Sequence, residues 1–255
     1  MRAPLQLIPL EHFPLVEPGD DLARLTAESL QANALQLQEG DVLVFAQKVV
    51  SKSENRYRRL SEVNPSARAT AMAEQADKDA RLVELILGES SEVVRVRPGV
   101  MIVEHHSGCV LANAGIDRSN IQSEPDDPRV LLLPENPDRS ARTLRIELGR
   151  LTGVTPQVVI NDSVGRAWRN GTVGIAIGCA GMDPLHNQIG HTDLFGNVLE
   201  VTEPAVADEL AAAASLVMGQ AAEGCPVVLA RGFSFRHAEV GSSPLLREKS
   251  LDMFR

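Results

Sequence analysis

A turn and a long apolar run follow one another in Gly40-Asp-Val-Leu-Val-Phe-Ala-Gln-Lys-Val-Val50. The segment from Val42 to Val50 is mostly apolar on both of its alternating faces, which is typical of a strand buried at the centre of a sheet. The run ends in Ser51-Lys52-Ser53, and polar residues at the carboxyl end of a buried strand often form ligand sites. We therefore expect a central strand with a binding site at its carboxyl end.

Around this strand, the sequence predicts strands and helices that do not alternate strictly. The expected strands are 5–8, 92–97, 100–104, 109–112, 130–133, 157–160, 172–177 and 226–230, with a hairpin over 193–201, and the expected helices are 20–30, 65–87, 140–150 and 204–218. This order favours an α+β fold with a mixed sheet over a doubly wound α/β fold. Residues 1–255 are long enough for a single domain of two lobes, and 237–255 are expected to form a peripheral tail.

Composition and charge exclude several classes of protein. The 255 residues are 44% hydrophobic and 23% charged, with a net charge of -9, and this acidic balance argues against non-specific nucleic-acid binding. No apolar run approaches the ~20 residues of a membrane span, and no secretory signal is visible. The three cysteines, Cys109, Cys179 and Cys225, are far apart and odd in number, which indicates free thiols in a reducing cytoplasm.

Two acidic signatures stand far apart in the chain. They are Asn113-Ala-Gly-Ile-Asp117-Arg-Ser-Asn120 and Asn161-Asp162-Ser-Val-Gly-Arg-Ala-Trp-Arg-Asn-Gly171. Each is expected to form a loop after an apolar strand, and each combines an aspartate with hydroxyl or amide groups, arginine and glycine. Carboxylates bind hard divalent cations, whereas guanidinium groups and exposed backbone amides bind phosphate. The two loops together predict metal-dependent phosphate chemistry.

The second signature contains two arginines and the only tryptophan of the chain. If Arg166 and Arg169 face the same pocket as the two aspartates, they would complete the usual apparatus for phosphoryl transfer. Trp168 is expected in the wall that excludes water from the pocket. The simpler alternatives are that Asp117 belongs to an ordinary turn and that Asp162 only caps a helix or turn.

Other candidate residues have similar alternatives. Lys52 is a plausible phosphate clamp, whereas Lys48 lies within the apolar run and needs a paired role. Met218-Gly-Gln220 either ends a helix at a glycine cap or, with Glu223-Gly224, contacts a nucleotide. The sequence lacks a Walker-type loop, a Gly-x-Ser-x-Gly elbow and a His-Glu-x-x-His motif. Glu104-His-His106 could bind a metal, but it is expected to form the end of a hairpin with solvated side chains.

Several of these motifs, in this order, resemble the coenzyme F-420 gamma-glutamyl ligase family, also called coenzyme F-420-0:L-glutamate ligases. The resemblance covers nearly the whole chain. Its motifs are the opening Pro9-Leu-Glu11-His-Phe-Pro-Leu-Val16, then 40–52, 113–120, 162–171, Ala176-Ile-Gly-Cys-Ala-Gly181 and Met218-Gly-Gln220.

The resemblance implies a GTP-dependent ligase that adds L-glutamate to coenzyme F-420-0, and then further glutamate through a gamma linkage. It implies an acyl-phosphate intermediate, release of GDP and phosphate, two Mg2+ or Mn2+ sites and activation by K+. Members of the family are intertwined homodimers of two-lobed α+β subunits. Some relatives carry an additional reductase-like domain at the C-terminus, which is not expected here.

The resemblance also implies roles for individual residues. Asp117 and Asp162 would bind one cation, and Ser163 and Gln220 a second. The GTP site would comprise Glu11, His12, Phe13, Pro14, Gln47, Lys48, Lys52, Asn120, Met218, Gly219, Gln220, Ala221, Ala222, Glu223 and Gly224. Asp117, Asp162, Arg166 and Arg169 are the candidate catalytic residues.

The second loop departs from the family pattern, which commonly reads Asp-Thr-Phe-Gly-Arg-Pro-Trp-Arg. Here Ser163, Val164 and Ala167 replace the threonine, phenylalanine and proline. The hydroxyl is retained, while the acceptor contacts and the number of glutamates added stay open. Two other functions are considered: a regulatory protein that binds nucleotide and metal without turnover, and a metal-dependent phosphatase or amide hydrolase on the same scaffold.

Overall fold

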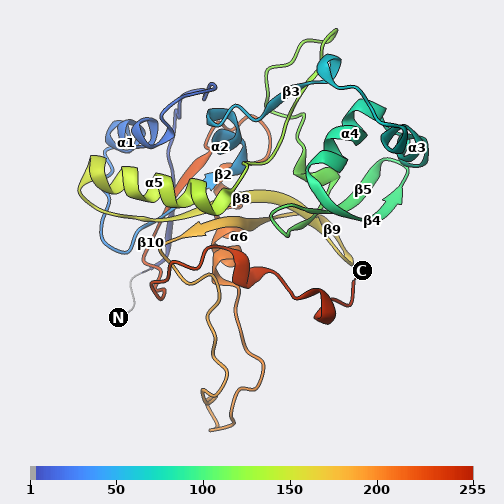
Figure 1. The fold of residues 1–255 in the computed structure, drawn as a ribbon. Coiled ribbons are helices and arrows are strands. Elements are labelled where there is room, and N and C mark those ends of the chain that lie inside the picture. The colour runs from blue at the N-terminus through green and yellow to red at the C-terminus, as the bar shows by residue number, and fades with distance from the viewer. Residues whose placement is uncertain (1–3, 255) are drawn as a thin grey trace.

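A five-stranded mixed sheet forms the centre of the protein (Figure 1). The structure is a computed structural model and describes residues 4–254. The strand order is β1 (Gln6–Pro9), β10 (Val227–Arg231), β2 (Val42–Ala46), β8 (Gln157–Arg166) and β9 (Arg169–Ala180). Only β2 and β8 pair in parallel, while the other neighbours are antiparallel. The chain therefore has the mixed-sheet α+β architecture expected from its sequence.

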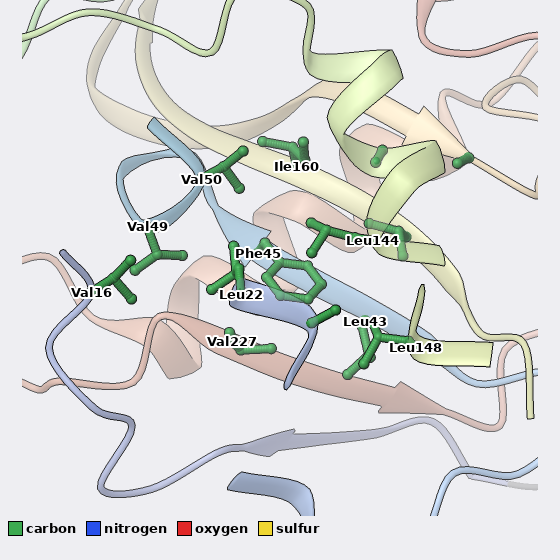
Figure 2. Packing of buried hydrophobic residues seen from close by; sticks show 14 of the residues in the cluster. Val16, Leu22, Leu43, Phe45, Val49, Val50, Leu144, Leu148, Ile160 and Val227 are labelled. Carbon is green, nitrogen blue, oxygen red and sulfur yellow. The ribbon is translucent and has the colours of Figure 1, made fainter. Parts of the chain in front are cut away.

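Helices cover both faces of this sheet, which explains why β2 is apolar throughout. Helices α1 (Leu22–Ala32) and α5 (Pro137–Thr152) lie on one face, and α6 (Val206–Met218) lies on the other. Figure 2 shows Phe45 of β2 in one cluster with Leu22 of α1 and with Leu144 and Leu148 of α5. Val44 packs in the opposite cluster with α6. The predicted central, doubly buried strand is thus confirmed.

The strand is shorter than predicted, because the chain turns into a helix after Ala46. Helix α2 (Gln47–Ser53) follows β2 directly. A short apolar run does not by itself distinguish a strand from a buried helix, and here Val49 and Val50 stay buried in helical geometry. The helix places Gln47 and Ser51, and likewise Lys48 and Lys52, four residues apart on neighbouring turns.

A second unit packs beside the central sheet. It contains a sheet of β4 (Ser90–Arg97), β5 (Val100–His105) and β6 (Val110–Ala112) with helices α3 (Ala67–Ala76) and α4 (Ala80–Gly88). The prediction of a single helix over 65–87 is wrong, because the structure has two helices there. Asp77 takes a left-handed conformation that ends α3, and Asp79 caps α4 by accepting a hydrogen bond from the Arg81 amide at 2.9 Å.

The remaining elements are short. Strands β3 (Tyr57–Arg59) and β7 (Arg129–Leu131) form a two-stranded sheet. The 3-10 turns are η1 (Leu60–Glu62), η2 (Asn113–Gly115), η3 (Ser243–Leu245) and η4 (Lys249–Leu251). Helix α5 begins after an Asn136 cap rather than at Ser140, because Pro137 fits the first helical turn.

The segment between β9 and α6 extends away from the body of the protein (Figure 1). The hairpin expected over 193–201 is reduced to a turn with one isolated bridge between Thr192 and Val198. Pro204 precedes the Ala205 cap of α6 instead of lying in its first turn.

The C-terminal segment runs along the outside of the fold and is held there by hydrogen bonds and ion pairs. The Ser242 amide and hydroxyl both donate to Asp138 of α5, at 2.8 and 3.2 Å. Lys249 pairs with Glu92 and Glu104 of the second unit. Among residues 4–254, no helix is long and apolar enough to cross a membrane.

Candidate active site

The first acidic signature is a tight turn that delivers Asp117 to the end of the central sheet. Three successive residues, Asn113, Ala114 and Gly115, have positive φ angles of 52°, 56° and 67°. A Cβ atom on Gly115 would lie 2.8 Å from the Leu133 side chain, so the turn requires glycine there. Asp117 then forms two backbone hydrogen bonds with Leu131, each 2.9 Å long.

Two side chains from the start of α2 hold the Asp117 carboxylate. Gln47 Nε2 donates to Asp117 Oδ2 at 2.6 Å, and Lys48 Nζ lies 3.1 Å from the same oxygen. Lys48 thus has the paired role that its position in an apolar run required. The contacts join segments 70 residues apart in the chain.

The second acidic signature is not a loop, because β8 continues through it. Asp162 and Ser163 lie in the strand and pair with Ile175 and Gly174 of β9. A bulge between Ile160 and Asn161 changes the register just before Asp162. The Asp162 residue is only 9% exposed, and its Oδ1 accepts a hydrogen bond from the Ser163 amide at 2.8 Å.

The two carboxylates converge closely enough to influence each other. Burial, and after it the negative charge of Asp117, raise the pKa of Asp162 to about 7, while the hydrogen bond from the Ser163 amide and the positive charge of Lys48 act in the opposite direction. Lys48 therefore affects both aspartates. The meeting of the two distant signatures, which the sequence predicted, is present in the structure.

This arrangement fits a divalent cation. Two adjacent carboxylates, one of them buried, repel each other in a site of low dielectric, and a hard cation would remove that repulsion. Among the described residues, no group of three or more His, Cys, Asp or Glu side chains gathers as a metal site. Ser163 and Gln220, the residues expected at a second cation, both line the pocket that contains Asp162.

A pocket of about 320 Å³ opens beside Asp162. Its lining includes most of the residues expected in the nucleotide site: Phe13, Pro14, Gln47, Lys48, Lys52, Asn120, Met218, Gly219, Gln220, Ala221, Ala222, Glu223 and Gly224. It also includes Asp162 and Ser163, which are expected to bind metal. Glu11, His12 and Asp117 are not part of the lining, although Gln47 and Lys48 connect Asp117 to it.

The loop after α6 is folded around Glu223. Gly219 has a φ of 71°, and a Cβ atom there would lie 2.1 Å from the Glu223 carboxyl carbon. Glu223 accepts a hydrogen bond from the Ala221 amide at 2.8 Å. Asn120 Nδ2 donates to the Ala221 carbonyl at 2.9 Å, so the first acidic signature is also tied to this loop.

Lys52 supplies a second cation from α2, one helical turn after Lys48. Burial lowers its pKa, which Glu17 partly offsets, and Lys48 lowers it further. A half-buried ammonium group near a second one is stabilised by an anion. The two lysines therefore suit the phosphate groups of a ligand in this pocket.

The β8–β9 hairpin carries Arg166, Trp168 and Arg169 away from the pocket. The two strands continue as a ribbon, and Trp168 at its turn is 88% exposed, with its ring 6.2 Å from that of Phe254. Arg166 donates to the Gly171 carbonyl at 3.1 Å. Arg166, Trp168 and Arg169 are not in the lining of the pocket beside Asp162, so the expectation that they face it is not met in this chain.

Asn161 is a pocket residue that the sequence reasoning did not select. Its Nδ2 donates to Ser215 Oγ at 3.0 Å and approaches Met218 Sδ at 3.5 Å, which connects β8 to the end of α6. Its Oδ1 is buried without a hydrogen-bond partner within residues 4–254. The feature of the sequence that points to Asn161 is its position next to Asp162, on the opposite face of the same strand.

Two other features lie away from these carboxylates. A second cavity of about 660 Å³ lies between α1, α5 and the end of α2. It is larger, but its lining lacks both acidic signatures, so we place the chemistry in the smaller pocket. Glu104 and His105 are buried rather than solvated: His105 Nδ1 contacts Ser107 at 3.0 Å and Nε2 lies 3.5 Å from Glu89.

Comparison with known proteins identifies the family. Residues 11–232 match the family described as F420-0:Gamma-glutamyl ligase. The chain belongs to this family. Three similar proteins, each named coenzyme F420:L-glutamate ligase, come from Methanothermobacter thermautotrophicus, Methanopyrus kandleri and Archaeoglobus fulgidus. They are 47%, 46% and 41% identical to it, each covering 98% of this chain and 99%, 97% and 96% of the relative.

Membership of the F420-0:gamma-glutamyl ligase family confirms the resemblance drawn from the ordered motifs. The matched range contains both acidic signatures and the whole pocket beside Asp162. It ends at residue 232, before the C-terminal segment. The site built from geometry therefore lies inside the part of the chain that defines the family.

Proposed function

We propose that this protein is a GTP-dependent ligase that adds L-glutamate to coenzyme F-420-0 and further glutamate through a gamma linkage. The observation that carries the proposal is the convergence of Asp117 and Asp162, with Lys48 acting on both, beside a pocket formed by the family's motifs. The names of the three relatives support the choice of coenzyme F-420 and L-glutamate as substrates.

The reaction joins a carboxylate to an amine in two steps. An oxygen of the acceptor carboxylate attacks the γ-phosphorus of GTP, and the bond from that phosphorus to GDP breaks. The amine of glutamate then attacks the acyl carbon of the acyl phosphate, phosphate leaves with the bonding electrons, and the nitrogen loses a proton. The first attack needs the carboxylate in line with the bond that breaks, the second needs the amine over the face of the acyl carbon, and both need protection from water.

The residues of the chain provide binding, charge and position. Asp117 and Asp162 would hold one Mg2+ or Mn2+ ion, and Ser163 and Gln220 a second. When bound, the cations would reduce the repulsion between carboxylate and triphosphate. Lys48 and Lys52 supply positive charge beside the phosphates, and the loop 218–224 surrounds the nucleotide. K+ belongs to the proposal as an activator with no assigned residue.

The proposal includes a homodimer in the cytoplasm. Leu194 and Phe195 lie on the segment that extends from the body, and they are 98% and 90% exposed. Two neighbouring apolar side chains that both project into solvent form a small apolar surface that a second copy of the chain could bury. The cysteines are free thiols, as expected in a reducing compartment.

Replacing either aspartate tests the proposed site. Asp117→Asn and Asp162→Asn should each lower glutamate-dependent phosphate release at least 100-fold and retain the circular-dichroism spectrum of the folded protein. The assay is mass spectrometry of products formed from GTP, Mn2+, glutamate and F-420-0. Asp126→Asn, at an exposed position away from the pocket, is the matched control.

The same assay separates the other functions. GTP binding without glutamate-dependent phosphate release would indicate a regulatory protein. Phosphate release that is independent of glutamate and acceptor would indicate a phosphatase or hydrolase. Near-normal ligation by both aspartate variants would contradict the metal assignment.

A further inference from the structure

A chain of side-chain hydrogen bonds leads from the interior of α2 to Asp117. Ser51 Oγ donates to Gln47 Oε1 at 3.0 Å, and Gln47 Nε2 donates to Asp117 Oδ2 at 2.6 Å. Ser51 is 0% exposed and Gln47 is 2% exposed. The two residues are four apart on α2, so the helix itself brings their side chains together.

The chemistry of the three groups fixes the direction of the amide. An ionised carboxylate only accepts hydrogen bonds, so the Gln47 amide must present its NH2 group to Asp117. Its carbonyl oxygen then faces Ser51, whose hydroxyl can donate to it. Loss of the Ser51 hydroxyl would leave a buried carbonyl without this partner, which weakens the preference for one orientation.

The arrangement also distinguishes the two oxygens of Asp117. Gln47 and Lys48 both contact Oδ2. Within the described chain, no hydrogen bond to Oδ1 is formed. Oδ2 is therefore held by protein donors, and Oδ1 is the oxygen left for a cation.

We infer that Gln47 is a positioning residue for the metal-binding carboxylate of Asp117, and that Ser51 locks Gln47 in the required orientation. This assigns the Gln47 side chain a task different from the direct nucleotide contact expected from the family motif. The inference rests on the proposed function only in that Asp117 binds a cation. Groups that orient metal ligands in this way commonly change metal affinity about 10- to 100-fold when removed.

Metal binding without substrates tests the inference. The dissociation constant for Mn2+ is measured by electron paramagnetic resonance on the full-length protein with no nucleotide present. Gln47→Met, which keeps the length of the side chain, should weaken Mn2+ binding about 10- to 100-fold. Ser51→Ala should weaken it by a smaller factor, and Ser51→Thr, which keeps the hydroxyl, should restore it.

Thr26→Val is the matched control. Thr26 is also fully buried on a helix, but its hydroxyl donates only to the Leu22 carbonyl of α1 at 2.7 Å. Its removal should leave Mn2+ affinity unchanged. Thermal melting of each variant verifies folding, and if Gln47→Met does not fold, Ser51→Ala and its threonine rescue decide the question.

Two results would overturn the inference. One is unchanged Mn2+ affinity in both Gln47→Met and Ser51→Ala. The other is a raised KM for GTP with unchanged Mn2+ affinity, which would make Gln47 a direct nucleotide contact. Failure of the proposed function would give a different result: the wild-type protein would bind Mn2+ but would not add glutamate to F-420-0.

Discussion

A buried carboxylate with a raised pKa makes the stability of the metal-free protein depend on pH. The pKa of Asp162 is raised from 3.8 to about 7, mainly by burial and then by Asp117. The folded state therefore binds this proton more tightly than the unfolded state. The resulting stabilisation is present below pH 4 and is lost as the pH rises from about 4 to about 7.

Asp162→Asn should remove this dependence, because an amide does not titrate in that range. With EDTA present, the variant should melt at a higher temperature than the wild type at pH 8, and the difference should shrink toward pH 4. Thermal unfolding across this pH range measures the effect, with Asp126→Asn as an exposed control. Parallel pH profiles for wild type and Asp162→Asn would show that burial of this charge carries no cost.

The sequence predicts which residues lie at the site, but it does not predict which of their side chains bond to one another. Asp117 and Asp162 were selected because their residue types suit a cation, and the structure brings them together. The contact between Gln47 and Asp117 depends on the docking of segments 70 residues apart. No local pattern contains that information, so the sequence alone does not predict that the Gln47 amide contacts the Asp117 carboxylate.

Among the helices and strands, the break between α3 and α4 is marked by local signals in the sequence. Asp77 has φ 49° and ψ 55°, in the left-handed region that glycine adopts more easily. Asp79 caps the next helix. Both aspartates are visible in the sequence, but the apolar periodicity of the flanking segments suggested one continuous helix. By contrast, the end of β2 at Ala46 had no turn residue to mark it.

Substitutions at the two sides of this break should have opposite effects. Asp77→Gly should stabilise the protein by up to about 1 kcal/mol, because glycine tolerates the left-handed conformation. Asp79→Ala should destabilise it by about 1 kcal/mol through loss of the helix cap. Urea denaturation monitored by circular dichroism gives both values. Effects of the same sign would contradict the assignment of Asp77 as the end of α3 and Asp79 as the start of α4.

On the scale of the whole molecule, the segment between β9 and α6 projects from the body and ends in a hydrogen-bonded turn (Figure 1). Asp193 accepts hydrogen bonds from the Phe195 and Asn197 amides at 2.8 and 2.9 Å, and from Asn197 Nδ2 at 2.9 Å. These bonds hold the turn that presents Leu194 and Phe195. A fixed turn with two exposed apolar side chains is suited to insertion into a second subunit.

Replacing both side chains by serine therefore tests the proposed homodimer. Burying a leucine or phenylalanine side chain stabilises an association by about 1.5–3 kcal/mol, so Leu194→Ser with Phe195→Ser should weaken dimerisation by several hundred-fold or more. Sedimentation velocity over a range of concentrations measures this shift. Leu151→Ser, which changes a partly exposed leucine on α5, should leave the dimer intact. A wild-type protein that stays monomeric at all concentrations, or a double variant that dimerises as strongly as the wild type, would show that this turn does not hold two subunits together.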